Sequence, residues 1–429
     1  MSHSNYTRNI LNIKDENIIF NEDCLTIKKI NGVYTKIFHG KLTYTPTVCP
    51  NCGCIYEQNP DTIIKYGFKN SCKIKMDKVA NFNVLLLLDK QRFFCKYCNS
   101  TFIAETPLVD FHKQISNNVK LSVTLELMDK GSEKDNAKRN NISSPSVNRI
   151  LDSITDDKFI KNNGHLPEVM GIDEFKATSD TISKMAFIIV NQDNKNIFDI
   201  NNSRKSNDIE KYFKRYSKKE RNKVRFITMD LYKPYYNLMH SLFKNAILIP
   251  DRFHIVLQVR NALDKTRINL CHKSNPNYIK LKKYWKLILK DKRDLDRDNK
   301  SYQKCFRKEM SQFDIVSYLL NTNYELYETY KVYQSIIYSI DTRNKDIFLS
   351  IIHKQNKNTS KYMKKAIKTF NNMEQYILNA LDYEYSNGIV EGTNNLIKQI
   401  KHAACGYRKF SHLKARVMLV KGLYSPIKV

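Results

Sequence analysis

The sequence has no long apolar segment. Its longest clean apolar run is VLLLL at 84–88, far short of the roughly 20 residues that span a bilayer. The first residues, MSHSNYTRN, also lack the apolar core of a secretory signal peptide. Both absences argue against membrane insertion and export, and we expect a soluble, cytoplasmic protein.

Acidic residues are scarce relative to basic ones. The 429 residues include 43 Asp and Glu against 72 Lys and Arg, for a formal net charge of +29. Such a surplus indicates a polyanionic partner, because basic surfaces release the counterions condensed on nucleic acid. An anionic membrane surface is the competing partner. An AT-rich genome would also raise the lysine content, without any functional reason.

No repeat of fixed period is visible, and the length predicts two to four domains. Strand-like pieces surround clustered cysteines up to residue 105, and three short helices are predicted within 116–155. From 168 to 250 the predicted order is β-β-β-α-β-α-β, typical of an α/β domain with a mixed sheet. Helices follow to residue 385, interrupted by a charged loop or turn at 290–304, and a final helix is predicted from Asn387 to His402.

Ten cysteines are present, and in a cytosolic chain we expect thiols or metal ligands rather than disulfides. Two Cys-x-x-Cys knuckles occur, formed by Cys49 with Cys52 and by Cys95 with Cys98. Two such knuckles complete a closed tetrahedral zinc site, which is structural rather than catalytic. Chance proximity and a redox motif are the alternatives, although a redox motif would not need a second copy. Cys54 and Cys72 are possible substitutes.

Residues 132–154 fit a helix-turn-helix. The spacing i, i+3, i+4, i+7 predicts one buried face on its second helix, made of Val147, Ile150, Leu151 and Ile154. We expect the residues that can touch phosphates and base edges to face outward, namely Ser144, Ser146, Asn148 and Arg149. An ordinary three-helix packing unit is the alternative, and the basic context favours DNA binding.

Two aspartates end predicted strands. Asp173 follows VMGI, and Asp230 follows VRFITM just before a helix. Side chains at such strand ends project into the crevice where ligands bind, and an acid there is costly unless it is solvated, paired or metal-bound. With a third carboxylate they could hold two Mg²⁺ ions about 3.5–4 Å apart. Glu391 is the candidate, since a helix would align it with Asn395, Lys398 and His402.

Other acids compete for this role. Glu174 adjoins Asp173 but alternation sends it to the opposite face of the strand. Asp251 follows another strand, and we favour a helix cap for it. Any single acid is more often solvated or capping than catalytic, so spacing alone leaves the metal site open.

Five segments in order carry a family resemblance: GIDEF at 171–175, TMDLYKPY at 228–235, DRFH at 251–254, NGIVEGTNNLIK at 387–398 and GYR at 406–408. Together they resemble a bacterial DDE transposase of the insertion-sequence family ISL-three. The resemblance is collinear over nearly the whole chain and includes the two knuckles and the helix-turn-helix. One departure is AAC at 403–405, where a more basic or aromatic run is expected.

The resemblance implies a multidomain α/β protein whose ribonuclease-H-like core is interrupted by an all-α insertion. Asp173, Asp230 and Glu391 would be the catalytic triad, holding two Mg²⁺ or Mn²⁺ ions. The implied domains are a zinc-binding domain at 1–110, a helix-turn-helix domain at 111–160, the first part of the core at 165–257, the helical insertion at 258–380 and the final core helices at 381–429.

The implied reaction is hydrolysis of a DNA strand at each transposon end, followed by attack of the freed 3′-OH on target DNA. The zinc module and helix-turn-helix would bind the terminal inverted repeats, and Asn395, Lys398 and Arg408 are candidates for DNA contacts. Two ends must be brought together, so we expect a homodimer or larger assembly, associated with the bacterial nucleoid.

Two other functions remain open. One is a domesticated DNA-binding regulator, which would not need the intact triad. The other is a ribonuclease-H-like nuclease without strand transfer, against which the helix-turn-helix and the large insertion argue.

Overall fold

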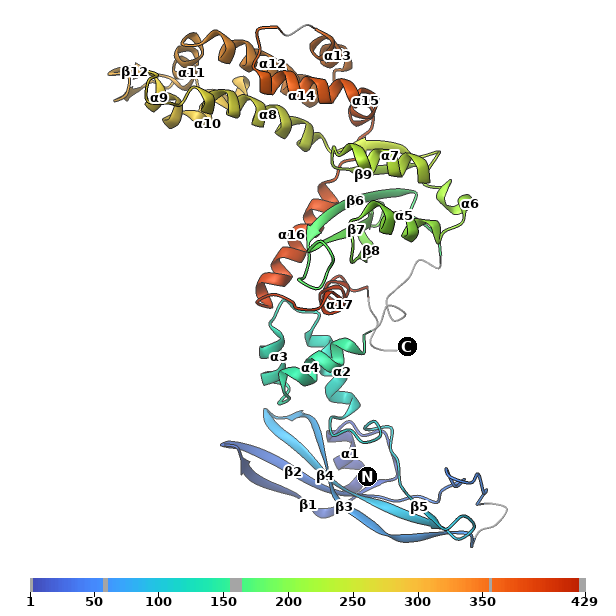
Figure 1. Ribbon diagram of the computed structural model, residues 1–429. Helices are drawn as coiled ribbons and strands as arrows, with labels where there is room; N and C mark the ends of the chain where they lie inside the picture. Colours follow the sequence, from blue (N-terminus) through green and yellow to red (C-terminus); the bar gives the residue numbers. More distant parts are fainter. Residues whose placement is uncertain (1–2, 57–60, 155–163, 355–356, 424–429) are drawn as a thin grey trace. The chain divides into compact units, whose positions relative to one another are not determined.

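The computed structural model describes residues 3–56, 61–154, 164–354 and 357–423 (Figure 1). Its contacts divide the chain into two compact units. Unit 1 comprises Met1–Ile160 together with Ile397–Val429, and unit 2 comprises Lys161–Leu396. The predicted mixed α/β class is confirmed, because both units combine helices with a sheet that holds parallel and antiparallel strands.

Unit 1 begins with a short helix and a five-stranded sheet. These elements are α1 (His3–Ile10), β1 (Ile18–Ile30), β2 (Val33–Leu42), β3 (Ile63–Val79), β4 (Phe82–Cys95) and β5 (Ser100–Ile103). The strand order is β1-β2-β4-β3, with β5 paired to β4, and only β2 and β4 run parallel. The apolar run at 84–88 is part of β4, where Val84, Leu86 and Leu88 alternate into the core.

Four helices complete unit 1: α2 (Asn117–Glu126), α3 (Glu133–Arg139), α4 (Ser144–Asp152) and α17 (Phe410–Val420). The three short helices expected within 116–155 are therefore present. Ser116 and Ser132 cap the first two through their hydroxyl groups, as serine favours. The predicted apolar face of α4 is buried.

Helix α17 packs against α4 in unit 1. His412 Nε2 lies 2.8 Å from Asp152 Oδ1, and the buried Arg416 donates to the carbonyl oxygens of Asp129 and Gly131, at 2.6 Å each. The domain boundaries drawn from the sequence stay a prediction. The described contacts group 397–429 with the N-terminal residues rather than with the residues around Asp173.

Unit 2 contains a five-stranded mixed sheet in the order β10-β9-β6-β7-β8. The strands β6 (Val169–Lys176), β7 (Met185–Asn191) and β8 (Asn196–Asn201) are antiparallel neighbours, whereas β9 (Phe226–Met229) and β10 (Ile247–Pro250) continue in parallel from β6. The helices between later strands are α5 (Ser206–Lys214), α6 (Lys218–Arg221) and α7 (Lys233–Leu242). This order agrees with the prediction, and α6 is an addition to it.

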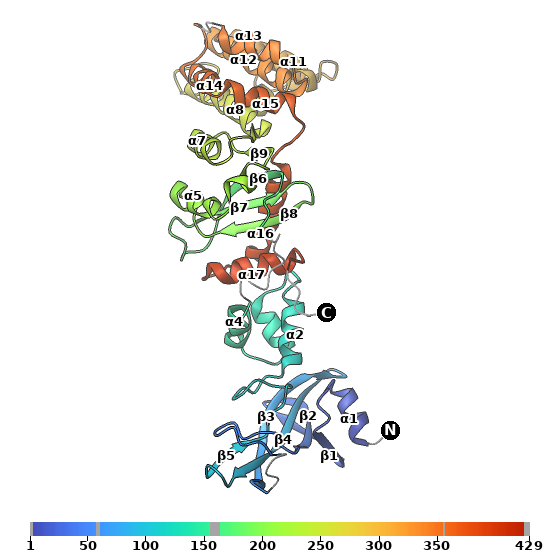
Figure 2. The same ribbon diagram turned by 90° about the vertical axis from the view of Figure 1, so that its right-hand side faces the viewer.

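The sheet of unit 2 is covered on both faces. Figure 2 shows α5 and the first half of α16 (Gly388–Ala403) on opposite sides of β6 and β7. Because both faces are covered, β6 begins with four consecutive buried residues instead of an alternating pattern. A mixed sheet with such helices is compatible with a ribonuclease-H-like core, which stays a prediction.

Helices fill the rest of unit 2. They are α8 (Arg252–Asn269), α9 (Tyr278–Lys283), α10 (Trp285–Ile288), η2 (Lys292–Asp294), α11 (Gln312–Asn321), α12 (Tyr324–Asp341), α13 (Lys345–His353), α14 (Lys361–Asn372) and α15 (Glu374–Asp382). The charged segment at 290–304 is mostly loop or turn, as expected, but it also contains η2 and β11 (Ser301–Gln303), which forms a hairpin with β12 (Lys308–Met310).

One buried core extends from the sheet of unit 2 into these helices. Helix α15 packs against β10, and Asn379 Nδ2 donates to the Leu248 carbonyl at 3.0 Å. None of the described helices combines the length and apolar character that crossing a membrane requires.

Candidate active site

The pairing of β6 with β9 brings two predicted site residues together. These strands run parallel with Gly171 opposite Thr228. Continuing that register by two residues sets Asp173 beside Asp230, and paired positions of neighbouring strands direct their side chains to the same face. Two aspartates that are 57 positions apart in the sequence thus become neighbours. Asp230 directly follows β9, as predicted, but the prediction that Asp173 ends its strand is wrong, because pairing with β7 continues β6 to Lys176.

Both aspartates are partly buried, and this changes their acidity. Burial raises the pKa of Asp173 to about 7, and the nearby charge of Asp230 adds to the shift. Burial also raises the pKa of Asp230, opposed by His254, whose Nε2 lies 3.1 Å from Asp230 Oδ1. Two crowded carboxylates with hard oxygen donors fit a divalent cation, which would offset their repulsion.

Helix α16 contributes from the adjacent face. Asn394 Nδ2 donates to Asp173 Oδ2 at 2.6 Å. Glu391 lies in the first turn of the helix and is exposed. In the described part of the chain, the cysteine cluster alone brings three or more potential ligand atoms within 4.8 Å of one another. The structure therefore pairs Asp173 with Asp230 but does not gather Glu391 into a tight trio with them.

A buried polar network fixes the start of α16 against the sheet. The Thr228 hydroxyl donates to Asn387 Oδ1 at 3.0 Å, and the Gln192 amide donates to that hydroxyl and to the Ser386 carbonyl. Gly171 allows the close approach, since a Cβ there would lie 2.4 Å from Val390 Cγ2. The glycine two residues before Asp173 thus explains how the helix reaches the site.

The two competing acids have structural roles. Asp251 caps α8, accepting a hydrogen bond from the backbone N–H of Phe253 at 3.2 Å, as predicted. Glu174 forms an ion pair with Arg204 at 2.6 Å and accepts a hydrogen bond from the Tyr235 hydroxyl. Both acids are thus engaged in other contacts, so neither is a better candidate than the members of the predicted triad.

The predicted DNA-contact residues differ in exposure. Ser146 was expected to face outward, and this orientation is wrong: it is buried, and its hydroxyl contacts Ser143 at 2.9 Å and Arg149 at 3.0 Å. The reason is that Ser146 faces the first turn of its own helix, where a hydroxyl can bond locally. Ser144 and Asn148 are half-buried, and the exposed members of the set are Arg149, Asn395, Lys398 and Arg408.

The four knuckle cysteines meet in unit 1. All four Sγ atoms lie within 4.8 Å of one another, with Cys49 to Cys98 at 3.7 Å and Cys52 to Cys95 at 3.8 Å. A tetrahedron with Zn–S bonds of about 2.3 Å has S···S edges of about 3.8 Å, so the cluster fits zinc. A hydrogen bond with the Ser100 hydroxyl lowers the pKa of Cys98 to about 6, which favours the thiolate that binds metal.

Each knuckle is followed by a residue in the left-handed backbone conformation, which is a glycine in the first and an asparagine in the second. Gly53 has φ +73° and donates its N–H to the Cys49 carbonyl at 2.9 Å. Asn99 follows the second knuckle with φ +55°. Asparagine is among the few non-glycine residues that adopt this left-handed conformation readily. The β3–β4 hairpin fills the long interval between the knuckles.

Comparison with known proteins finds a family match over residues 170–417. A family model for DDE transposases of the ISL-three type, described as "Transposase", matches this segment, which is more than half of the chain. The chain belongs to the ISL-three family of DDE transposases. The match includes Asp173 and Asp230, α16 and most of α17.

A curated relative of this transposase has a different printed name. The chain is 32% identical over 127 residues to an "ATP-dependent protease" of Lactococcus lactis subsp. lactis. That alignment covers 29% of this chain and 41% of the relative, so the chain spans about two fifths of the relative's length. The printed activity describes the Lactococcus protein.

Two residues that contact the aspartates of this transposase, His254 and Asn394, were not predicted as site residues from the sequence. His254 is in the DRFH segment, but its contact with Asp230 depends on the turn from β10 into α8. Asn394 lies three residues after Glu391, a helical spacing that would have put it on the same side of α16. That spacing is the signal which could have identified it.

Proposed function

We propose that this transposase cuts DNA at insertion-sequence ends in a divalent-metal-dependent reaction and transfers the freed 3′ ends to target DNA. Asp173, Asp230 and Glu391 are the proposed metal ligands. The observation that carries the proposal is the register-matched, partly buried pair of Asp173, within β6, and Asp230, just after β9, inside the segment that matches the family.

The chain's own residues prepare this site in defined ways. Asn394 holds one oxygen of Asp173, and His254 offsets the charge of Asp230. Two Mg²⁺ or Mn²⁺ ions bound there would activate the attacking oxygen and stabilise the leaving oxygen of an in-line displacement. Closure of Glu391 onto the two aspartates would complete the ligand set, and positioning then supplies much of the rate enhancement.

DNA binding is proposed to involve both units. The net charge of +29 supports contacts with many phosphates. We assign the terminal inverted repeats to the zinc cluster and to helices α2–α4, with Arg149 reaching the DNA. Asn395, Lys398 and Arg408 would contact the backbone close to the site, while a homodimer or larger assembly holds two ends together in the bacterial nucleoid.

A plasmid assay separates this proposal from its alternatives. A supercoiled plasmid carrying the element's two ends is incubated with the full chain and Mg²⁺. Strand transfer into target DNA is the expected result. Cutting without joining would indicate a nuclease, and end binding without cutting would indicate a regulator.

The first prediction concerns Asp230→Asn. Removing one charged ligand should abolish cleavage of the plasmid while end binding, measured by gel shift, stays within about twofold of the parent, because the variant keeps the shape of the side chain. Asp193→Asn, an exposed aspartate between β7 and β8 of the same sheet, is the matched control and should cut normally. Parent-like cleavage by Asp230→Asn would refute the triad.

A further inference from the structure

Unit 1 has a hollow that the proposed chemistry does not use. Its volume is about 360 Å³, within the size range of ligand sites, and it lies between β3, β4, the end of β5 and the loop at 111–114. The register of β3 with β4 shifts between Lys69 and Cys72, where Ser71 has φ +51° and donates its N–H to Asp89 at 2.7 Å. This bulge forms one wall of the hollow.

The opposite wall is held in place by backbone hydrogen bonds. Lys75 N–H donates to the Gln114 carbonyl at 2.8 Å, and Ser116 N–H donates to the Lys75 carbonyl at 3.0 Å. The loop at 111–114 therefore adds to the edge of β3 as a fixed segment. It presents Phe111 and His112, whose ring centroids are 4.0 Å apart in an edge-on arrangement.

The charge of the hollow is strongly positive. Four lysines line it, namely Lys69, Lys73, Lys90 and Lys113, against a single acid, Glu105. Lys90 is half-buried, and no hydrogen bond or ion pair to its ammonium group is found within the described residues. The exposed carboxylate of Glu105 is a nearby counter-charge for Lys90, but it makes no ion pair with it and stands against four lysines. A partly buried ammonium group that is only partly compensated is costly, so this position favours a bound anion.

A second hollow of about 360 Å³ adjoins the first, and Lys90, Glu105 and Phe111 line both. Its aspartate, Asp110, is already neutralised by an ion pair with Lys120. Phe111 is 65% exposed between the two hollows. An exposed ring beside an unpaired ammonium offers a stacking surface for an aromatic group next to a site for its phosphate.

We propose that this paired hollow binds one unpaired nucleotide of DNA, with the base stacked on Phe111 and the phosphate at Lys90. A base inside a duplex has both faces covered by its neighbours, so the ring selects a base that has left the stack. The inference rests on the proposed function in taking DNA as the ligand. It adds that unit 1 recognises an unpaired nucleotide as well as duplex sequence.

The test uses the full chain with a short single-stranded oligonucleotide that carries 2-aminopurine and a blunt duplex of the same sequence. Lys90→Gln and Phe111→Ala should each weaken single-strand binding about tenfold, since stacking and phosphate contacts each contribute on that order. Phe111→Ala should also abolish the quenching of 2-aminopurine fluorescence. Lys90→Arg, which keeps the charge, should bind like the parent, and duplex affinity should stay within about twofold for all three variants.

A second exposed lysine–aromatic pair on the same sheet provides the control. Lys29 lies over the Tyr34 ring at 5.9 Å, and Tyr34 is 60% exposed. Lys29→Gln with Tyr34→Ala should leave single-strand binding unchanged. Parent-like binding by Lys90→Gln and Phe111→Ala, or equal losses on single strand and duplex, would overturn the inference. Displacement of the oligonucleotide by inorganic phosphate at equal affinity would also overturn it, because the base would then contribute nothing.

The two proposals can fail separately. Asp230→Asn should retain single-strand binding and quenching, since Asp230 lies in unit 2. If the parent transfers strands in the plasmid assay but the hollow variants bind normally, the inference fails and the proposed function stands. If the hollow variants lose single-strand binding but the parent does not cut, the proposed reaction fails and the nucleotide site stands.

Discussion

Single residues determine how closely α16 approaches Asp173 and Asp230. Gly171 has no side chain at the point where Val390 packs on β6, and the nearby Thr228 and Asn387 are joined by a buried hydrogen bond. Gly171 lies two residues from Asp173, and Thr228 lies two residues from Asp230. Val390 and Asn387 lie one and four residues from Glu391. A small change in packing here would therefore alter both the stability of unit 2 and the geometry of the proposed site.

The second prediction follows for Gly171→Ala. Its methyl group would lie 2.4 Å from Val390 Cγ2, so α16 must shift, and we expect unit 2 to lose about 1–3 kcal/mol of unfolding free energy. Thermal unfolding measures the loss, and plasmid cleavage should fall with it.

Two variants make that prediction specific. Gly392→Ala adds a methyl group on α16, two residues after Val390. Nothing lies within 4 Å of that methyl position, so this variant should not destabilise the protein. Adding Val390→Ala to Gly171→Ala should recover part of the loss, because it removes the clashing Cγ2 atom. Equal unfolding temperatures for Gly171→Ala and the parent would contradict the close approach.

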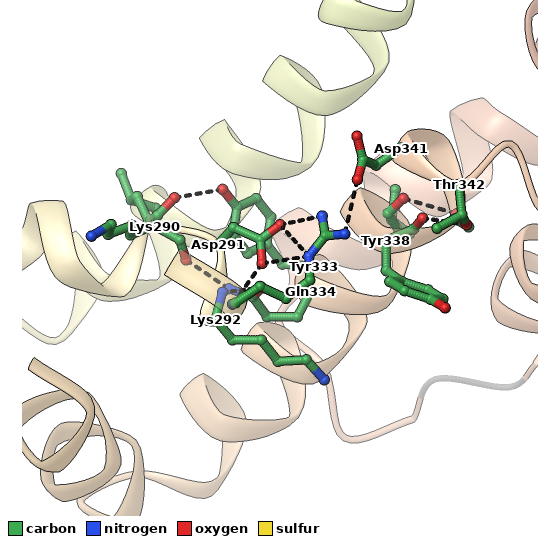
Figure 3. A network of polar contacts seen from close by, with 12 residues as sticks. Lys290, Asp291, Lys292, Tyr333, Gln334, Tyr338, Asp341 and Thr342 are labelled. Atoms are coloured by element: carbon green, nitrogen blue, oxygen red, sulfur yellow. Dashed lines mark hydrogen bonds and ion pairs between the residues drawn. The ribbon is translucent and has the colours of Figure 1, made fainter. Parts of the chain in front are cut away.

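At the scale of elements, α12 organises the helical part of unit 2. Figure 3 shows its side chains reaching the segment between α10 and η2. Tyr333 donates to the Leu289 carbonyl at 2.7 Å, and the buried Gln334 accepts from Lys292 N–H and donates to the Lys290 carbonyl, both at 2.9 Å. This turn lies at the start of the segment expected to be a loop or turn, and these bonds fix its backbone.

The third prediction is that Gln334→Leu destabilises unit 2 by about 1–3 kcal/mol. Leucine has similar size but cannot pair with the backbone groups of Lys290 and Lys292, which would be left without partners. Thermal or denaturant unfolding measures the loss. Lys331→Gln removes a surface ion pair with Glu328 and a cation–π contact with Tyr327, both on the same helix, and should change stability by less than about 1 kcal/mol. Equal stability of both variants would show that the Gln334 contacts contribute little.

At the scale of the whole molecule, the two units depend on different sources of stability. Unit 1 has its own buried core beside the cysteine cluster, whereas unit 2 has a larger core shared by its sheet and helices. A metal that links two knuckles from distant parts of a sheet stabilises the fold directly. The two units should therefore respond differently to loss of the metal.

The fourth prediction is that purified protein contains one zinc ion per chain, and that chelation lowers the unfolding temperature of unit 1 while that of unit 2 stays unchanged. Cys52→Ser should lose the metal and show the same selective shift, because three thiolates hold zinc less tightly than four. Cys405→Ser, outside the cluster, should retain it. Metal analysis and calorimetry check both statements, and protein without zinc would remove the assignment.

The sequence by itself determined the family, the order of strands and helices in 168–250 apart from α6, the grouping of the four knuckle cysteines and the capping role of Asp251. These features depend on local patterns: apolar periodicity, Cys-x-x-Cys spacing and ordered motifs. The tertiary structure alone decided that Asp173 and Asp230 are neighbours, that His254 and Asn394 contact them, that Ser146 is buried and that α17 packs on α4. The aspartate pair, the His254 contact and the packing of α17 depend on strand register or on packing between segments more than 20 residues apart, which no local pattern encodes. Helical spacing indicates the side of α16 on which Asn394 lies, but its contact with Asp173 depends on how α16 packs on the sheet, and the burial of Ser146 depends on what packs around α4.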